Sequence, residues 1–188
     1  MTTRTIRADA QRNREKLLEA AAATFAEKGS DASLELIAKR AGVGIGTLYR
    51  HFPTRDALVE AVYRTEVERL TAAAAELLES HPPDVALTEW MDRFVAYAVT
   101  KRGLRGALQS LVASRSDLFA NTKTELLRAI STLLDAGVAA GTIRADVDAE
   151  DVLRAMSAVW TLNEEPGWHE QARTVLRLLM DGLRYGAT

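Results

Sequence analysis

The sequence predicts an all-α protein of about nine helices, and three features of the chain support this fold class. Ala and Leu are abundant, whereas β-branched residues are scattered rather than gathered into runs. No stretch alternates apolar and polar residues over the length of a strand. Apolar residues recur instead at helical spacing, in segments that end at Gly or Pro.

The composition predicts a globular protein that stays in the cytoplasm. Hydrophobic residues make up 47% of the 188 residues and charged residues 27%, which is ordinary for a soluble protein. The chain has no cysteine, which excludes disulfides and thiolate metal sites and fits a reducing compartment. The polar N-terminus lacks the apolar stretch of a signal peptide, and no apolar run approaches the roughly 20 residues of a membrane-spanning helix. We therefore expect no membrane partner.

Positive charge is concentrated at the N-terminal end of the chain. Residues 1–55 hold ten Lys and Arg against six Asp and Glu, whereas residues 56–188 hold fourteen against twenty. A modestly basic unit suits a polyanion, and an acidic unit does not, although a solvated charged face would look similar. We expect two domains with these boundaries, the first suited to a nucleic acid.

Residues 1–55 are expected to form three helices after a polar arm. The first helix ends at Gly29, and Ser33 is a candidate N-cap for the second. Gly42 marks a tight turn before the third helix, which Pro53 closes. The residues expected to face inward are Leu18, Ala21, Ala22, Phe25, Leu34, Ile37, Ala38, Ala41, Leu48 and Phe52.

The rest of the chain is expected to form a helical bundle. Thr54 can cap a long helix, and breaks follow at residues 81–83, Gly141 and residues 166–167, with a shorter helix after Gly103. The expected apolar stripes contain Leu58, Val59, Val62, Trp90, Phe94, Tyr97, Leu126, Leu127, Ile130, Leu133, Leu134, Val152, Met156, Val159, Trp160, Ala172, Val175, Leu176, Leu179, Met180 and Leu183.

The segment from Ser33 to Phe52 has the features of a helix-turn-helix. Ala38 is small where two short helices must cross, and Gly42 tolerates the positive φ that the turn between them requires. Hydrogen-bonding and cationic groups remain outward on the second helix, and such groups read base edges and bind phosphates. These outward residues are Thr47, Tyr49, Arg50 and His51, preceded by Gly46.

Four short runs in this region, taken together, carry a specific resemblance. They are residues 25–29 (FAEKG), the Ile37-Ala38 to Gly42-Val43 pattern, residues 46–52 (GTLYRHF) and residues 54–58 (TRDAL). In combination they resemble the DNA-binding domain of the TetR family of transcriptional regulators, over about the first sixty residues. The segment from Trp90 to Leu104 is similar to an SbtR-type subgroup of that family.

The resemblance implies a set of residues that contact double-stranded DNA. Arg50 is the best candidate for reading a base, because a guanidinium can pair bidentately with guanine, while Tyr49 and His51 are expected to position the protein on phosphates. Two alternatives stay open, since Tyr49 could pack mainly on the preceding helix and His51 could be a solvated surface residue. The implied DNA-contacting residues are Ser33, Gly46, Thr47, Tyr49, Arg50, His51 and Arg55.

Aromatic residues of the C-terminal part are candidates for an effector pocket. They could also be simple core, and pocket walls and cores share the same apolar side chains. Tyr97, Gln109 and Asn163 could supply polar anchors to a small apolar or amphipathic molecule. The candidate pocket residues are Trp90, Phe94, Tyr97, Phe119, Met156 and Trp160.

The last two long helices carry apolar residues over an arc too wide for one intrachain core. We therefore expect them to pair two protomers into a homodimer, which matches a pseudo-palindromic operator. The resemblance implies a repressor that an effector releases from DNA. The expected interface residues are Val159, Val175, Leu176, Leu179 and Leu183.

Other chemistries fit the sequence poorly. The glycines at 42, 44 and 46 follow a helix rather than a strand, which argues against a nucleotide loop. Glu164, Glu165 and His169 could suggest metal ligands, but the Pro-Gly at 166–167 interrupts the helix that would align them. No nucleophile has a matching base, so we expect neither catalysis nor a cofactor. The rival class is a helical ligand-binding or scaffold protein that never touches DNA.

The N-terminal arm itself has two interpretations. Its arginines could bind phosphates or a minor groove, or the arm could be a solvated tail. The residues concerned are Arg4, Arg7, Arg12 and Arg14.

Overall fold

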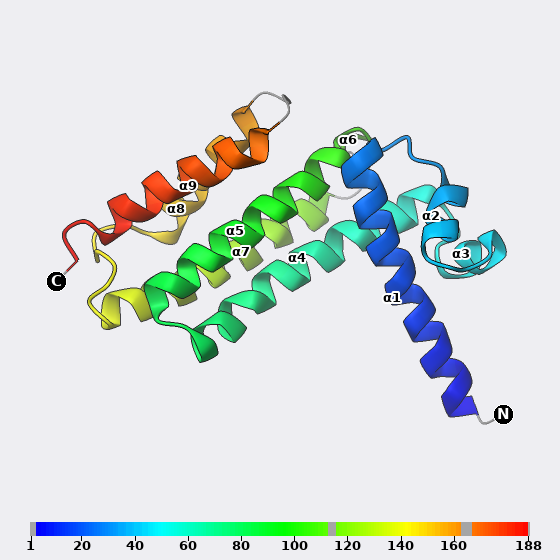
Figure 1. Ribbon diagram of the computed structural model, residues 1–188, viewed down its shortest axis with the longest axis horizontal. Helices are drawn as coiled ribbons and strands as arrows, with labels where there is room; N and C mark the ends of the chain where they lie inside the picture. Colours follow the sequence, from blue (N-terminus) through cyan, green and yellow to red (C-terminus); the bar gives the residue numbers. More distant parts are fainter. Residues whose placement is uncertain (1–2, 113–115, 163–166, 188) are drawn as a thin grey trace. The chain divides into compact units, whose positions relative to one another are not determined.

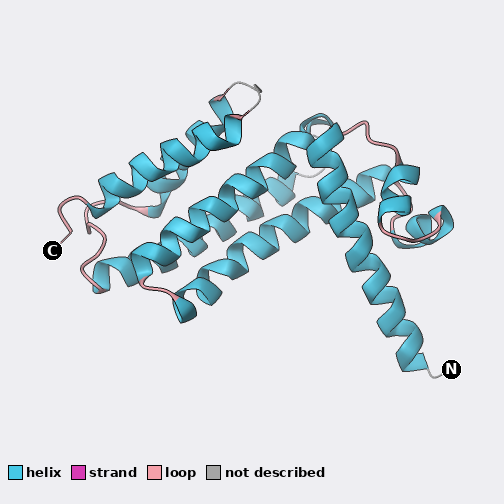
Figure 2. Ribbon diagram, viewed as in Figure 1, coloured by secondary structure: helices cyan, strands magenta, loops and turns pink. Residues whose placement is uncertain are grey.

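The computed structural model describes residues 3–112, 116–162 and 167–187, and within these ranges it holds nine α-helices, one short 3₁₀ helix and no strand (Figures 1 and 2). The predicted all-α fold class is confirmed. The helices are α1 (Thr3–Lys28), α2 (Leu34–Arg40), α3 (Ile45–His51), α4 (Arg55–Ser80), α5 (Pro83–Gly103), α6 (Arg105–Val112), α7 (Ser116–Ala139), α8 (Ala149–Met156), the 3₁₀ helix η1 (Ser157–Thr161) and α9 (Trp168–Arg184).

These helices form two compact units. The first unit comprises Met1–Glu66 and Thr100–Ser116, and the second comprises Val67–Val99 and Asp117–Thr188. Both α4 and α5 therefore contribute residues to each unit. These units are defined by packing alone. The expected domains, residues 1–55 for DNA binding and residues 56–188 for dimerisation and effector sensing, stay a prediction.

Helix α1 begins earlier than the sequence indicated. Residues 3–14, expected as an arm, belong to this helix, because no Gly or Pro interrupts residues 3–28. Pairs one turn apart line its exposed surface, with Gln11 donating to Glu15 over 2.8 Å and Arg12 paired with Asp9. The helix ends as predicted at Gly29, whose φ is +75° and whose N–H donates to the Phe25 carbonyl over 2.9 Å.

The helix-turn-helix has the predicted caps and turn. The Ser33 hydroxyl oxygen accepts the Leu36 N–H over 3.1 Å at the start of α2. Gly42 has φ +69°, a backbone conformation that residues with a Cβ rarely adopt. The Thr54 hydroxyl oxygen accepts the Ala57 N–H over 3.1 Å and caps α4.

The core of the first unit joins these helices through completely buried side chains. Burial of apolar surface contributes about 25 cal/mol per Å², so this core rather than helix propensity stabilises the short α2 and α3. The apolar side chains without exposed surface are Leu17, Ala21, Phe25, Ile37, Leu48, Leu58, Val59 and Leu104.

The second unit is built around Trp90 on α5. Its side chain is 0% exposed, and its indole Nε1 donates to the Leu70 carbonyl of α4 over 2.7 Å. Helix α9 is tied to α5 by Arg184, which donates to the Asp84 carboxylate over 2.8 Å. Arg173 lies 3.6 Å from Asp92 in a second pair between the same helices.

Replacing Trp90 with alanine should lower the free energy of unfolding by about 3–5 kcal/mol, because the cavity left in a filled core cannot be closed by its neighbours. Urea denaturation of Trp90→Ala measures the loss. The matched control is Trp168→Ala, since Trp168 is only half-buried and its removal should cost less. A loss below about 1 kcal/mol for Trp90→Ala would contradict a filled core.

Candidate functional site

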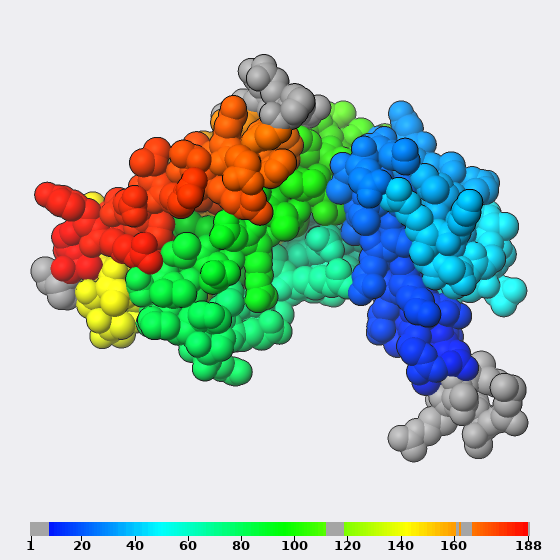
Figure 3. Space-filling model, in the orientation of Figure 1, coloured from blue at the N-terminus to red at the C-terminus, as the bar shows by residue number. Residues whose placement is uncertain are grey.

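Helix α3 presents one buried and one exposed side. Leu48 is 0% exposed and anchors the helix in the first unit, while Tyr49 on the other side is 46% exposed. Arg50 is exposed and takes no part in the core. The segment containing α2 and α3, light blue in Figure 3, lies at the molecular surface. The exposed residues of α3 are Ile45, Gly46, Tyr49 and Arg50, with Thr47 and His51 half-buried.

The outward side of α3 fits close approach to a partner. Tyr49 has nearly half its surface available, which disfavours the alternative that it packs mainly on the preceding helix. A Cβ added to Gly46 would meet no heavy atom within 4 Å, so the glycine faces open space. His51 lies beside Phe52, with their ring centroids 6.3 Å apart, and stays half-buried.

Ser33 combines a structural and a surface role. Its oxygen accepts the Leu36 N–H, so the hydroxyl hydrogen remains free to donate outward. The residue is exposed at the N-terminus of α2, where the helix dipole favours negative charge. This position suits a phosphate oxygen.

Arg55 is placed differently from the sequence expectation. Its guanidinium donates to the Ala32 carbonyl from Nη1 over 2.8 Å, and Nη2 donates to the same oxygen. The same group lies 5.9 Å from the centroid of the Phe25 ring. Arg55 therefore connects the start of α4 to the end of α1 and the loop before α2, a structural role that the sequence did not predict.

Arg40 is a second connecting residue that sequence reasoning missed. It donates to the Thr24 hydroxyl over 3.2 Å and to the Glu27 carboxylate over 2.7 Å, linking α2 to the last turn of α1. The hydrogen bond from Arg40 holds the pKa of the Glu27 carboxyl below its usual value. The i, i+13 and i, i+16 spacings of these pairs give no local signal.

Two further residues lie near α3. The sequence suggested Arg14 only as a candidate contact to phosphates or a minor groove, and it did not single out Ile45. Arg14 of α1 lies 5.5 Å from the centroid of the Phe52 ring and so contacts the end of α3. Ile45 is 37% exposed and lies one turn before Tyr49, where it adds an apolar side chain to the exposed surface. Its position four residues before Tyr49 was a usable signal.

The candidate effector residues form a packed aromatic cluster in the second unit. The centroid of the Phe94 ring lies 6.3 Å from the ring centroid of Trp90, 5.8 Å from that of Tyr97 and 6.0 Å from that of Trp160. Trp90, Phe94, Tyr97 and Met156 are buried, whereas Phe119 and Trp160 are half-buried. This packing has the character of a filled core, and pocket lining stays a prediction.

Of the three expected polar anchors, only Tyr97 is shown to belong to this cluster. Gln109 is exposed on α6 and belongs to the first compact unit, whereas Tyr97 belongs to the second. Asn163 lies outside the described residues, as do Glu164 and Glu165, while His169 is exposed 3.8 Å from Glu170. Across the part of the chain that the structure describes, no group of three or more His, Cys, Asp or Glu is placed to hold a metal ion.

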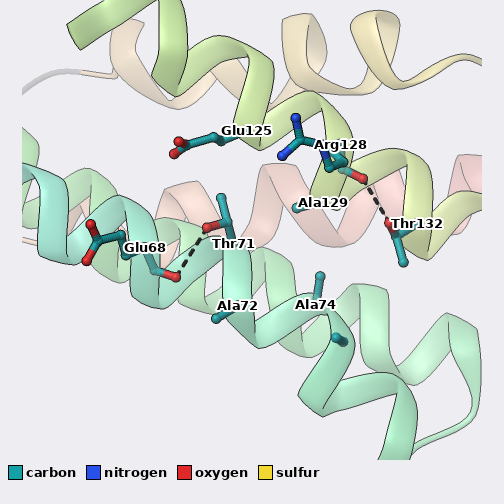
Figure 4. A pocket seen from close by; sticks show the side chains of 9 residues that line it. Glu68, Thr71, Ala72, Ala74, Glu125, Arg128, Ala129 and Thr132 are labelled. Carbon is teal, nitrogen blue, oxygen red and sulfur yellow. Dashed lines mark hydrogen bonds between the residues drawn. The ribbon is translucent and has the colours of Figure 1, made fainter.

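A surface cavity of about 400 Å³ lies between α4 and α7 within the second unit (Figure 4). Four alanines are among its lining residues, and Thr71 and Thr132 donate their hydroxyls to carbonyls of their own helices. Small and charged residues at irregular spacing gave no sequence signal for it. The lining residues are Glu68, Thr71, Ala72, Ala74, Ala75, Glu125, Arg128, Ala129 and Thr132.

Three of the five expected interface residues are buried within their own chain, while the dimer interface itself stays a prediction. Val159 is 0%, Leu176 3% and Leu183 2% exposed, so these three already pack inside their own chain and leave almost no surface for a partner. Val175 and Leu179 are half-buried. The apolar side chain that α9 does expose is Leu178, at 68%.

Both parts of the chain match described families. Residues 17–62 match bacterial regulatory proteins of the tetR family, and residues 82–185 match the C-terminal domain of SbtR-like transcriptional regulators. The chain belongs to the TetR family of transcriptional regulators. In the described ranges, no helix of this TetR-family chain has both the length and the hydropathy to cross a membrane.

Relatives of this TetR-family chain match it over nearly its full length. The HTH-type transcriptional repressor KstR2 of Rhodococcus jostii (strain RHA1) is 30% identical over 190 residues, covering 90% of each chain. The crystal structure of the TetR regulator SCO0520 from Streptomyces coelicolor has a TM-score of 0.85 at 45% identity, covering 93% of this chain and 99% of that one. The crystal structure of a TetR regulatory protein from Mycobacterium vanbaalenii has a TM-score of 0.75 at 39% identity, and the match covers 95% of this chain and 99% of that one. These relatives are named as regulators.

The two arginines of this TetR-family domain should differ in their effect on stability. Arg55→Ala should lower the free energy of unfolding by about 1–3 kcal/mol, because it removes charged hydrogen bonds to Ala32. Arg50→Ala should change it by less than about 0.5 kcal/mol, because Arg50 is exposed. Chemical denaturation of the free protein compares them, and equal stability of both variants would refute the structural role of Arg55.

Proposed function

We propose that this protein is a homodimeric repressor that binds a pseudo-palindromic operator through α2 and α3 and dissociates when a small molecule binds its C-terminal part. The proposal depends on one observation: α3 has a buried side and an exposed side. Leu48 is fully buried, whereas Tyr49 and Arg50 are exposed. Such a helix can enter a major groove while its core contacts hold it rigid.

The exposed residues take separate roles at the DNA. Arg50 reads a base edge, since a guanidinium can pair with guanine, and Thr47 lies on the same helix. Tyr49, His51 and the Ser33 hydroxyl bind phosphates and set the register. Gly46 lets the backbone approach closely. The Arg55 guanidinium is already engaged by the Ala32 carbonyl and the Phe25 ring, so any phosphate contact of its own is secondary.

The dimer is proposed to use the outward side of α9. Leu178 is 68% exposed, and Gly182 one turn later has no heavy atom within 4 Å of an added Cβ. Thr174 and Tyr185 share this side at helical spacing, and Tyr185 is 80% exposed. The half-buried Val175 and Leu179 flank it. A two-fold contact through this side matches a palindromic site.

The effector is proposed to be a small amphipathic molecule. The cavity between α4 and α7 is lined by four alanines and by the charged residues Glu68, Glu125 and Arg128. A lining with both apolar and charged groups suits a ligand that has both apolar and charged parts. The aromatic cluster around Phe94 is the other proposed region, and it would require the rings to separate. Binding must weaken DNA affinity by the factor by which DNA weakens the ligand.

Arg50→Ala should cost about 1–3 kcal/mol of binding free energy and relax the preference at one base pair in each half-site. Selection of bound sequences from random double-stranded DNA, run in parallel with wild type and variant, measures both effects. Arg154→Ala is the control, because Arg154 is an exposed cation on α8 paired with Asp151. Equal weakening on selected and random DNA would show that Arg50 binds only phosphate.

Leu178→Glu should shift the protein toward monomer, because an unpaired carboxylate would be buried in the proposed interface. Sedimentation measures the assembly state, and helical content should be unchanged because the side chain is exposed within its own chain. His169→Glu is the control, because this exposed position lies half a turn around the same helix from Leu178. A Leu178→Glu protein that remains dimeric would place the interface elsewhere.

A further inference from the structure

The end of α5 approaches the last turn of α1 more closely than any side chain would permit. A Cβ added to Gly103 would lie 2.2 Å from the Phe25 carbonyl oxygen, 2.7 Å from its carbonyl carbon and 3.1 Å from the Ala26 Cα. All three are backbone atoms, so no change of rotamer can relieve the overlap. Restoring an ordinary contact distance would require the two segments to part by about 1 Å.

The backbone that Gly103 contacts is the turn that holds α2. The Phe25 carbonyl accepts the N–H of Gly29 over 2.9 Å, which ends α1. Arg40 of α2 is bonded to Thr24 and Glu27 of the same turn. A displacement of this turn would therefore pass directly to α2, and from α2 to α3.

The corner after Gly103 is anchored and cannot simply swing away. Leu104 is 0% exposed, and its N–H donates to the Thr100 carbonyl over 3.0 Å. Helix α6 begins at Arg105, and Figure 1 shows it beside the end of α1. In this helix, Gly106 approaches the loop after α1, but an added Cβ there would meet only side-chain atoms of Ser30, with the hydroxyl oxygen at 2.8 Å and the Cβ at 3.8 Å. That hydroxyl can rotate away.

We infer that Gly103 is a positioning residue for DNA recognition. Its missing side chain lets the end of α5 pack directly on the backbone of Phe25. This contact sets where α1, α2 and α3, which are bonded to one another, lie together against the end of α5 within the first unit. The inference rests on the proposed function, since it concerns the same DNA-reading surface. Binding surfaces need their groups held to within about 0.5 Å, so a shift of about 1 Å has a measurable effect.

The test compares Gly103→Ala with the matched control Gly106→Ala. The operator is first selected from random DNA with the wild-type protein, and affinities are then measured for the full operator and for an isolated half-site. We expect Gly103→Ala to stay folded and to bind the full operator about tenfold or more weakly, with half-site affinity retained. Gly106→Ala should match wild type on both DNAs.

A second selection, made with Gly103→Ala, should return the same half-site sequence at an altered spacing. Wild-type affinity of Gly103→Ala for the full operator would overturn the inference, and so would an equal loss on the half-site. Loss of folding would also overturn it, because the glycine would then serve the fold rather than the placement of α2 and α3. If the wild-type protein itself selects no sequence, the proposed function fails. This result differs from failure of the Gly103 inference, in which wild type selects an operator but Gly103→Ala binds it as wild type does.

Discussion

The last turn of α1, from Thr24 to Lys28, holds the surface that we propose for DNA. Arg40 reaches it from α2, and Arg55 reaches it from α4 through the Phe25 ring. The carbonyl of the same phenylalanine accepts the N–H that ends the helix and lies against Gly103. Short helices such as α2 and α3 are marginal alone, so their position depends on these contacts.

This arrangement separates the cations of the first unit by role. The count of Lys and Arg in residues 1–55 overstates the charge that is available to DNA, because some of those groups are engaged inside the protein. Arg14, Arg40 and Arg55 each contact a ring, a carbonyl or a carboxylate. Arg50 is exposed and makes no contact of that kind. Structural cations thus fix the shape of the surface, and Arg50 is the exposed cation that we propose for base reading.

Local sequence signals predicted the helices, their caps and their turns well. Ser33, Gly42 and Thr54 take the expected roles, because capping and positive φ depend on residues only a few positions apart. The prediction of a polar arm before the first helix was wrong, because residues 3–14 belong to α1. A polar segment without Gly or Pro can continue a helix, and polarity alone does not end one.

Long-range contacts could not be predicted from the sequence. Arg55 was expected on a phosphate, but its partner at Ala32 lies 23 positions away. The wide apolar arc of α9 was assigned to a dimer, yet Leu176 and Leu183 are buried within the chain. Apolar periodicity shows that a face is covered but not by which element. The cavity between α4 and α7 was missed because alanines and threonines are equally common in plain helix packing.

A crystal structure of the protein with a DNA duplex selected from a random pool tests the central claim most directly. The account predicts α3 in the major groove, with the Arg50 guanidinium at a base edge and Arg55 still donating to the Ala32 carbonyl. DNA bound against another surface would contradict the account. So would an Arg55 that leaves Ala32 to hold a phosphate while Arg50 stays in solvent.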